Sequence, residues 1–212
     1  MGLTLVTGPA VEPVSLAEAK AHLRVDDDDS NDLIVALIGA ARQHVESFTR
    51  RKLITQTWDY QIDQFQSDAI VVPLAPVASV TSITYLDTAG ATQTWSSSNY
   101  RTDLPSGPWA QRPRIEPGYG LSYPLTYGVM NAVAVRCVVG YGSTASTVPA
   151  AIRAAMKILI GHWFEHREPV VTGTIIAMSE IRPILLKPST KTAITKGTKL
   201  IEVAKWMSPL TP

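Results

Sequence analysis

The sequence predicts an α+β protein: a helical bundle with an inserted small antiparallel β-sheet or sandwich, followed by an extended C-terminal arm. Apolar residues recur every three or four positions over residues 1–52 and again over 149–169, which is typical of amphipathic helices. Over 53–148 the apolar period is two, and clusters of Pro, Gly, Ser and Asn separate the runs. Residues 170–212 contain four prolines and a Ser/Thr/Lys stretch, which predicts an arm with one short terminal helix.

The composition narrows the function classes. Of the 212 residues, 45% are apolar and 17% are charged, against about 25% charged in an ordinary globular protein. This balance excludes intrinsic disorder and disfavours a strongly basic nucleic-acid binder. No apolar run reaches 18 residues and the start lacks a basic region, so we expect neither a membrane span nor a signal peptide. The single cysteine, Cys137, is expected to be buried in a protein made in a reducing interior.

The formal net charge of +1 is the result of a cancellation. Residues 1–181 contain 13 basic and 17 acidic side chains, a balance of −4, whereas residues 182–212 contain six and one, a balance of +5. A basic, proline-containing tail with an apolar end is typical of an arm that becomes ordered when it docks on another chain. The alternative is a C-terminal segment that packs on its own body.

The first helix is predicted to begin with a capping box, because Ser15 and Glu18 have the spacing at which each side chain bonds the other residue's backbone. It extends to about Arg24. The acidic run Asp26–Asp32 then breaks the helix, and its side chains are expected to cap the next one and to suit its positive end. The apolar face of the first helix consists of Leu16, Ala19 and Leu23.

Two longer helices and seven strands follow from the same periodicities. The second helix ends in the basic run Arg50–Lys52, and the third begins after Pro149 and stops at Pro169. Their predicted apolar stripes are Leu33, Leu37, Ile38, Ala41, Val45 and Phe48, and Ile152, Met156, Leu159, Ile160, Trp163 and Phe164. The predicted strands are 58–62, Ile70–Pro73, Val80–Asp87, Thr92–Trp95, Tyr100–Asp103, Arg114–Glu116 and Ala132–Val139.

The sharpest catalytic match is His162-Trp163-Phe164-Glu165-His166, which fits the H-x-x-E-H pattern of inverted zinc proteases. On a helix the two histidines lie one turn apart, and the glutamate could act as a base. A third ligand would have to come from a glutamate without a supporting helix or strand: Glu168, Glu180 or Glu202. Two histidines at a helix C-terminus also complement its dipole. A zinc-dependent hydrolase is therefore kept as an alternative, and we expect no enzyme, metal or cofactor.

Two other ligand patterns are weaker still. The acidic run lacks the glycine and the terminal glutamate of a calcium loop, since the sixth and twelfth positions from Asp26 are Asn31 and Leu37. A solvated loop between helices is the preferred interpretation. Gly140-Tyr141-Gly142 lacks the third glycine of a dinucleotide motif and is read as a turn.

Aromatic residues of the β region could form a stacking platform for sugars or bases. Their alternating positions favour sheet core or cross-strand pairs instead. The residues concerned are Trp58, Tyr60, Tyr85, Trp95 and Tyr100. A carbohydrate- or receptor-binding module is kept as a second alternative. A Gly- and Pro-rich stretch from Pro117 to Tyr127, with three tyrosines, is predicted to be a long loop that can contact a neighbour.

Five segments, taken in combination and in order, carry a family resemblance: Glu12–Val25, Leu53–Trp58, Asn131–Val133, Gly140–Gly142 and Ile160–Glu165. Together they resemble the head–tail connector (adaptor) proteins of long-tailed bacteriophages, prophages and gene transfer agents. The similarity covers about residues 3–188. It assigns His162 and Glu165 to a helix without a catalytic role.

The resemblance implies a structural virion protein at the head–tail junction, made in the cytoplasm of a bacterial host. It also implies a homo-oligomeric ring, typically of twelve copies, beneath the portal protein. Such a ring extends the DNA channel without binding DNA specifically and offers a platform to a head-completion (stopper) or tail protein. A weakly charged β region suits burial between neighbours in a ring, where each subunit needs two complementary faces.

Two sets of residues are candidates for these contacts. The family's C-termini dock on the portal, so we expect the arm to be anchored there or on an adjacent subunit by Leu200, Val203, Trp206 and Met207. In the acidic run, four side chains are candidates for lining the channel and repelling DNA phosphates: Asp26, Asp27, Asp28 and Asp29. The alternative for the acidic run is an outer surface loop.

Overall fold

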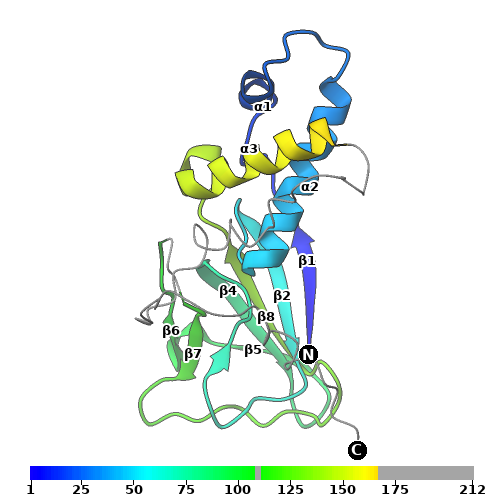
Figure 1. The fold of residues 1–212 in the computed structure, drawn as a ribbon. Coiled ribbons are helices and arrows are strands. Elements are labelled where there is room, and N and C mark those ends of the chain that lie inside the picture. The colour runs from blue at the N-terminus through cyan, green and yellow to red at the C-terminus, as the bar shows by residue number, and fades with distance from the viewer. Residues whose placement is uncertain (108–110, 167–212) are drawn as a thin grey trace, which may run out of the picture.

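The computed structural model describes residues 1–107 and 111–166, and it confirms the α+β class. Three helices lie together at one end of the strands (Figure 1). In chain order, the elements are β1 (Gly2–Thr7), α1 (Leu16–Leu23), α2 (Asn31–Thr49), β2 (Gln56–Ile62), β3 (Ile70–Val71), β4 (Val77–Leu86), β5 (Thr92–Trp95), η1 (Ser97–Asn99), β6 (Tyr100–Asp103), β7 (Arg114–Pro117), β8 (Val133–Val139), η2 (Ala145–Thr147) and α3 (Ala150–Glu165). The predicted arm, 170–212, lies outside the described residues.

The strands form two antiparallel sheets. The larger has the order β1-β2-β8-β4-β5, and the smaller has the order β3-β7-β6. Strand β8 is central, and its Cys137 is aligned with Trp58 of β2 and with Val80 of β4. Strand β1 precedes the helices in sequence yet pairs with β2, so one strand of the sheet comes from the N-terminal segment. The predicted strand boundaries hold to within three residues, and those of β5 and β6 are met at both ends.

Each part of the fold has its own apolar core. One core lies among the helices and includes Val14, Ile34, Val45 and Met156. The other lies in the β part and includes Ile83, Ile115 and Val135. Cys137 belongs to the second core and is fully buried, as expected, and burial raises the pKa of its thiol to about 12. The thiol therefore stays protonated and acts as a small apolar side chain.

The capping box of α1 is confirmed. The Glu18 backbone N–H donates to Ser15 Oγ at 3.2 Å, and the Ser15 N–H donates to Glu18 Oε2 at 3.1 Å. The hydrogen bond from Ser15, followed by that from Arg153, holds the pKa of Glu18 below its usual value. Arg153 of α3 also donates to the Pro13 carbonyl at 3.0 Å. The cap thus connects the start of α1 to α3.

Two expectations for α2 are wrong. Leu33 and Phe48 are 37% and 45% exposed, because the buried face contains Ile34, Ile38, Ala41 and Val45. The buried face of α2 therefore begins at Ile34 rather than at Leu33, because α1 and α3 pack on that side of the helix. The helical period of the sequence did not distinguish between these two neighbouring apolar residues.

The acidic side chains do not cap α2. The N-cap residue is Ser30, and its side chain makes no capping hydrogen bond. The Asp28 carbonyl accepts from the Asn31 N–H at 3.1 Å, while the Asp28 carboxylate accepts from Lys20 Nζ at 2.8 Å and from Asn31 Nδ2 at 2.9 Å. The carboxylate is therefore engaged by side chains, and the helix start is closed by backbone.

Gly140 allows two chain segments to cross at the end of β8. Its φ is +121°, and a Cβ at this position would lie 2.5 Å from the Ile54 carbonyl oxygen. The crossing is held by backbone bonds from Tyr141 N–H to Leu53 O at 3.1 Å and from Thr55 N–H to Gly142 O at 2.9 Å. Only glycine suits both this conformation and this approach. The turn predicted at Gly140–Gly142 is therefore a packing site between the two segments.

The carboxylate of Glu46, which is only 4% exposed, connects the helices to the larger sheet. Its Oε1 accepts from the Leu53 N–H and from Gln56 Nε2, both at 3.0 Å. Its Oε2 lies 3.1 Å from Lys52 Nζ and 3.8 Å from Arg42 Nη1. One side chain of α2 thus satisfies donors from the linker that follows and from β2, which fixes the helices on the sheet.

We expect Gly140→Ala to lower the free energy of unfolding by about 3 kcal/mol or more, because the methyl group meets backbone atoms at a strained φ. Gly39→Ala is the matched control, since a Cβ there meets nothing within 4 Å in α2, and it should stabilise by about 0.5–1 kcal/mol. Urea unfolding measures both values. Equal values for the two variants would contradict the crossing.

Glu46→Ala should cost about 3–5 kcal/mol in unfolding free energy, because Lys52 and the Leu53 N–H lose their buried acceptor. The control is Asp103→Ala, which removes an exposed pair with Arg114 and should cost less than about 1 kcal/mol. Urea unfolding measures the free energy of unfolding of both variants. A loss for Glu46→Ala as small as that for the control would refute the role of Glu46 in connecting the helices to the sheet.

Candidate functional site

The residues that match the H-x-x-E-H pattern lie at the last turn of α3. The rings of His162 and His166 are 4.8 Å apart, and both side chains are exposed, as is Glu165. Within residues 1–107 and 111–166 there is no group of three His, Cys, Asp or Glu side chains that could hold a metal ion. The candidate third ligands, Glu168, Glu180 and Glu202, lie outside the described residues. The last turn of α3 therefore carries a pair of exposed histidines.

The acidic loop, residues 26–29, connects α1 to α2 at the outer end of the helices (Figure 1). All four of its side chains are exposed or half-buried. The hydrogen bond from Lys20 lowers the pKa of Asp28, and Asp27 accepts from the Asp29 N–H at 3.2 Å. The loop thus carries a dense negative charge, and one of its carboxylates is paired with a lysine.

The five aromatic side chains considered for a stacking platform are buried or half-buried. Trp95 is 5% exposed and lies 5.3 Å from Phe65, 5.1 Å from Tyr100 and 5.4 Å from Tyr123, measured between ring centroids. Phe65 also stacks on Tyr123. Trp58, Tyr60 and Tyr85, from the set weighed for sugar binding, are buried or half-buried. The sheet-core interpretation of these residues is confirmed, and the stacking platform is wrong.

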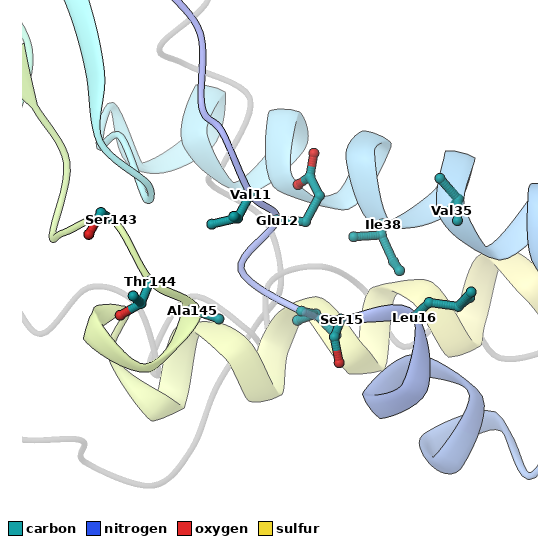
Figure 2. A pocket seen from close by; sticks show the side chains of 10 residues that line it. Val11, Glu12, Ser15, Leu16, Val35, Ile38, Ser143, Thr144 and Ala145 are labelled. Atoms are coloured by element: carbon teal, nitrogen blue, oxygen red, sulfur yellow. The ribbon is translucent and has the colours of Figure 1, made fainter.

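An apolar groove, which the sequence did not reveal, lies beside α2. Its volume is about 410 Å³, and Figure 2 shows it between the extended segment before α1, helix α2 and the residues around η2. Val35 on α2 and Val11 on the segment are exposed at its mouth. Its apolar lining consists of Val11, Val14, Leu16, Val35, Ile38 and Ala145. The one available signal was Val35, an apolar residue off the predicted stripe of α2.

Exposed apolar side chains also gather outside the groove. The stretch 117–131 contains no charged residue, and six of its apolar side chains are exposed. They are Tyr119, Leu121, Leu125, Tyr127, Val129 and Met130. Edge strand β1 adds Leu3, Leu5 and Val6. The predicted loop is confirmed, although Tyr123 of the same loop packs inside. Exposed apolar patches are common at contact surfaces, and contact of this loop with a neighbour stays a prediction.

The predicted anchors of the arm fall outside the described residues. They are Leu200, Val203, Trp206 and Met207. Their role as a partner contact therefore stays a prediction. The described residues contribute three other surface features: the acidic loop, the groove, and the exposed apolar side chains of 117–131 and β1.

Comparison with known protein families finds one match. The family model described as "Phage gp6-like head-tail connector protein" matches residues 13–101. This stretch includes α1, α2 and strands β2 to β5, and therefore both the acidic loop and the Glu46 junction. No curated protein sequence matches the chain.

Solved structures match over most of the chain. A chain in "Neck of empty GTA particle computed with C6 symmetry" is 22% identical with a TM-score of 0.73, and the match covers 91% of this chain and 99% of that one. Chains in "Virion of native gene transfer agent (GTA) particle" and "Neck of native GTA particle computed with C12 symmetry" match with the same coverage, at TM-scores of 0.71 and 0.67 and identities of 22% and 23%. At this identity the likeness shows a shared fold.

Fold and family agree with the expectation drawn from the five sequence segments. A head-tail connector is a structural component of a virion, so the family match supports a structural protein rather than an enzyme. Over residues 13–101 the chain is similar to the phage gp6-like head-tail connector family, and the predicted resemblance is confirmed.

Proposed function

We propose that this protein forms a ring, typically of twelve copies, beneath the portal protein of a virion. The ring extends the DNA channel and offers a platform to a head-completion (stopper) or tail protein. The observation that carries the proposal is the connector-family match over residues 13–101, together with a fold shared over 91% of the chain with a GTA neck. The C12 symmetry used for one of the similar structures supports twelve copies.

The surfaces of the subunit support such a ring. A closed ring requires two different complementary faces on each copy. Edge strand β1 with its exposed leucines and the uncharged stretch 117–131 are two apolar surfaces available for burial. None of the helices within the described parts of the chain is long and apolar enough to cross a membrane. The proposed partners are other proteins and the passing DNA.

The ring is tested by combining the full chain with portal complexes and imaging the product by electron microscopy. We expect a closed ring on the portal, because two apolar faces per subunit are buried when neighbours associate. A chain that stays monomeric and never associates with portals would refute the function.

The same assay tests the arm. A variant with alanine at four positions should form rings that attach to portals less often, since the proposed apolar anchors are shortened: Leu200, Val203, Trp206 and Met207. Unchanged attachment would remove the anchor from the proposal and leave the ring intact.

The acidic loop is proposed to face the channel. Its carboxylates would repel the phosphates of the DNA and allow the duplex to slide without adhering. Replacing all four aspartates of residues 26–29 by asparagine should then slow DNA packaging or ejection, measured as the rate of DNA release from assembled particles. An unchanged rate would place the loop on the outside.

A control of equal charge separates position from net charge. Four exposed acids in the β part, each replaced by its amide, change the chain by the same four charges: Asp63, Asp68, Asp103 and Glu116. These replacements should leave DNA release unchanged. A change in the rate of DNA release as large as that of the loop variant would show that total charge, and not the position of the loop, causes the effect.

A further inference from the structure

The apolar groove beside α2 has the lining of a site for apolar side chains. Its one ionisable side chain is Glu12, and that carboxylate is engaged by Arg42, whose Nε lies 2.8 Å from Oε2. Val35 is 53% exposed at the mouth of the groove, although the neighbouring face of the same helix, α2, is buried. A groove of about 410 Å³ with this lining suits a helix that presents its side chains at positions i, i+3, i+4 and i+7.

The chain itself contains one such pattern outside the described residues. Leu200, Val203, Ala204 and Met207 have the i, i+3, i+4, i+7 spacing. We propose that, in the unassembled subunit, residues 200–207 occupy the groove between α2 and the segment 11–16 of the same molecule. This inference concerns the free chain and does not depend on the ring.

The connection is long enough for this contact. The groove includes Ala145 of η2, next to the first turn of α3, and the chain leaves α3 at the other end of its 16 residues, about 24 Å away. The 33 residues from 167 to 199 can span up to about 110 Å. Tethering to the same molecule makes the contact intramolecular, which favours it over capture by a second copy at low concentration.

Charge favours the same path. The last turn of α3 lies beside α1, since a Cβ on Gly161 would be 3.6 Å from His22 Nε2, and the acidic loop follows α1 directly. Between 187 and 199 the chain has four lysines and no acid: Lys187, Lys191, Lys196 and Lys199. A basic connection that passes an acidic loop on its way to the groove gains attraction at low salt.

The contact would also protect the free subunit. Three of the residues proposed to fill the groove, Leu200, Val203 and Met207, are also proposed as anchors on the portal or on a neighbour, so the two contacts exclude each other. In the free chain the apolar end is then covered rather than available for non-specific association. Binding a partner would release it and uncover the groove.

The experiment uses the full chain with two added cysteines, Val35→Cys and Met207→Cys, under mild oxidation. Dilute monomer should form an intrachain disulfide, read as a shifted band on a non-reducing gel and confirmed by mass spectrometry. The native Cys137 thiol is buried and does not compete. The matched control pairs Met207→Cys with Ile158→Cys, because Ile158 is 52% exposed on α3 and does not line the groove.

We expect the groove pair to cross-link about tenfold faster than the control pair, at a rate independent of protein concentration. Adding Val203→Asp to the groove pair should reduce that rate to the control value. Equal rates for the two pairs would overturn the proposal, as would a rate that Val203→Asp leaves unchanged. Disulfides formed only between two molecules would overturn it as well, and none of these results bears on ring formation.

Discussion

The helical and β parts of the chain have separate apolar cores, and the carboxylate of Glu46 is where they are joined. Its hydrogen bonds collect donors from the linker after α2 and from β2, so the direction of α2 relative to the sheet is set at its C-terminal end. Lys52 extends the junction, because its ammonium also lies 4.6 Å from the ring centre of Trp58. Since α2 is a rigid 19-residue helix, about 28 Å long, this one junction determines where the acidic loop at its other end is held.

Features that depend on a few neighbouring residues could be predicted from the sequence. The capping box needs only Ser15 and Glu18, and strands β5 and β6 are bounded by turn residues next to them. The predicted apolar stripe of α2 is right at Ile38, Ala41 and Val45 and wrong at its start, because Leu33 and Ile34 are both apolar and only the position of α1 and α3 selects between them. The Glu46 junction and the groove join segments far apart in the chain, and no periodicity reports such contacts.

The β region contains few charged residues, and its uncharged side chains lie in two kinds of place. Large aromatic side chains such as Trp95 and Phe65 fill the space between the sheets, which removes them from the surface. The uncharged stretch 117–131 instead leaves leucine, valine, methionine and tyrosine side chains in solvent. A monomer that keeps such a surface has a cost in solubility, which burial in an assembly removes. The composition that excluded a bulk DNA binder thus fits a protein whose surface is completed by other proteins.

Strand β1 has a consequence for the geometry of the subunit. Met1 lies beside the far end of β2, with its amino group 4.0 Å from Asp63, while α3 ends among the helices (Figure 1). The amino terminus and the exit from α3 therefore lie at opposite ends of the molecule. In an assembly that aligns these subunits, a label attached to Met1 and a label attached after α3 would lie at different heights along the assembly axis. The two labels would therefore show which way each subunit points.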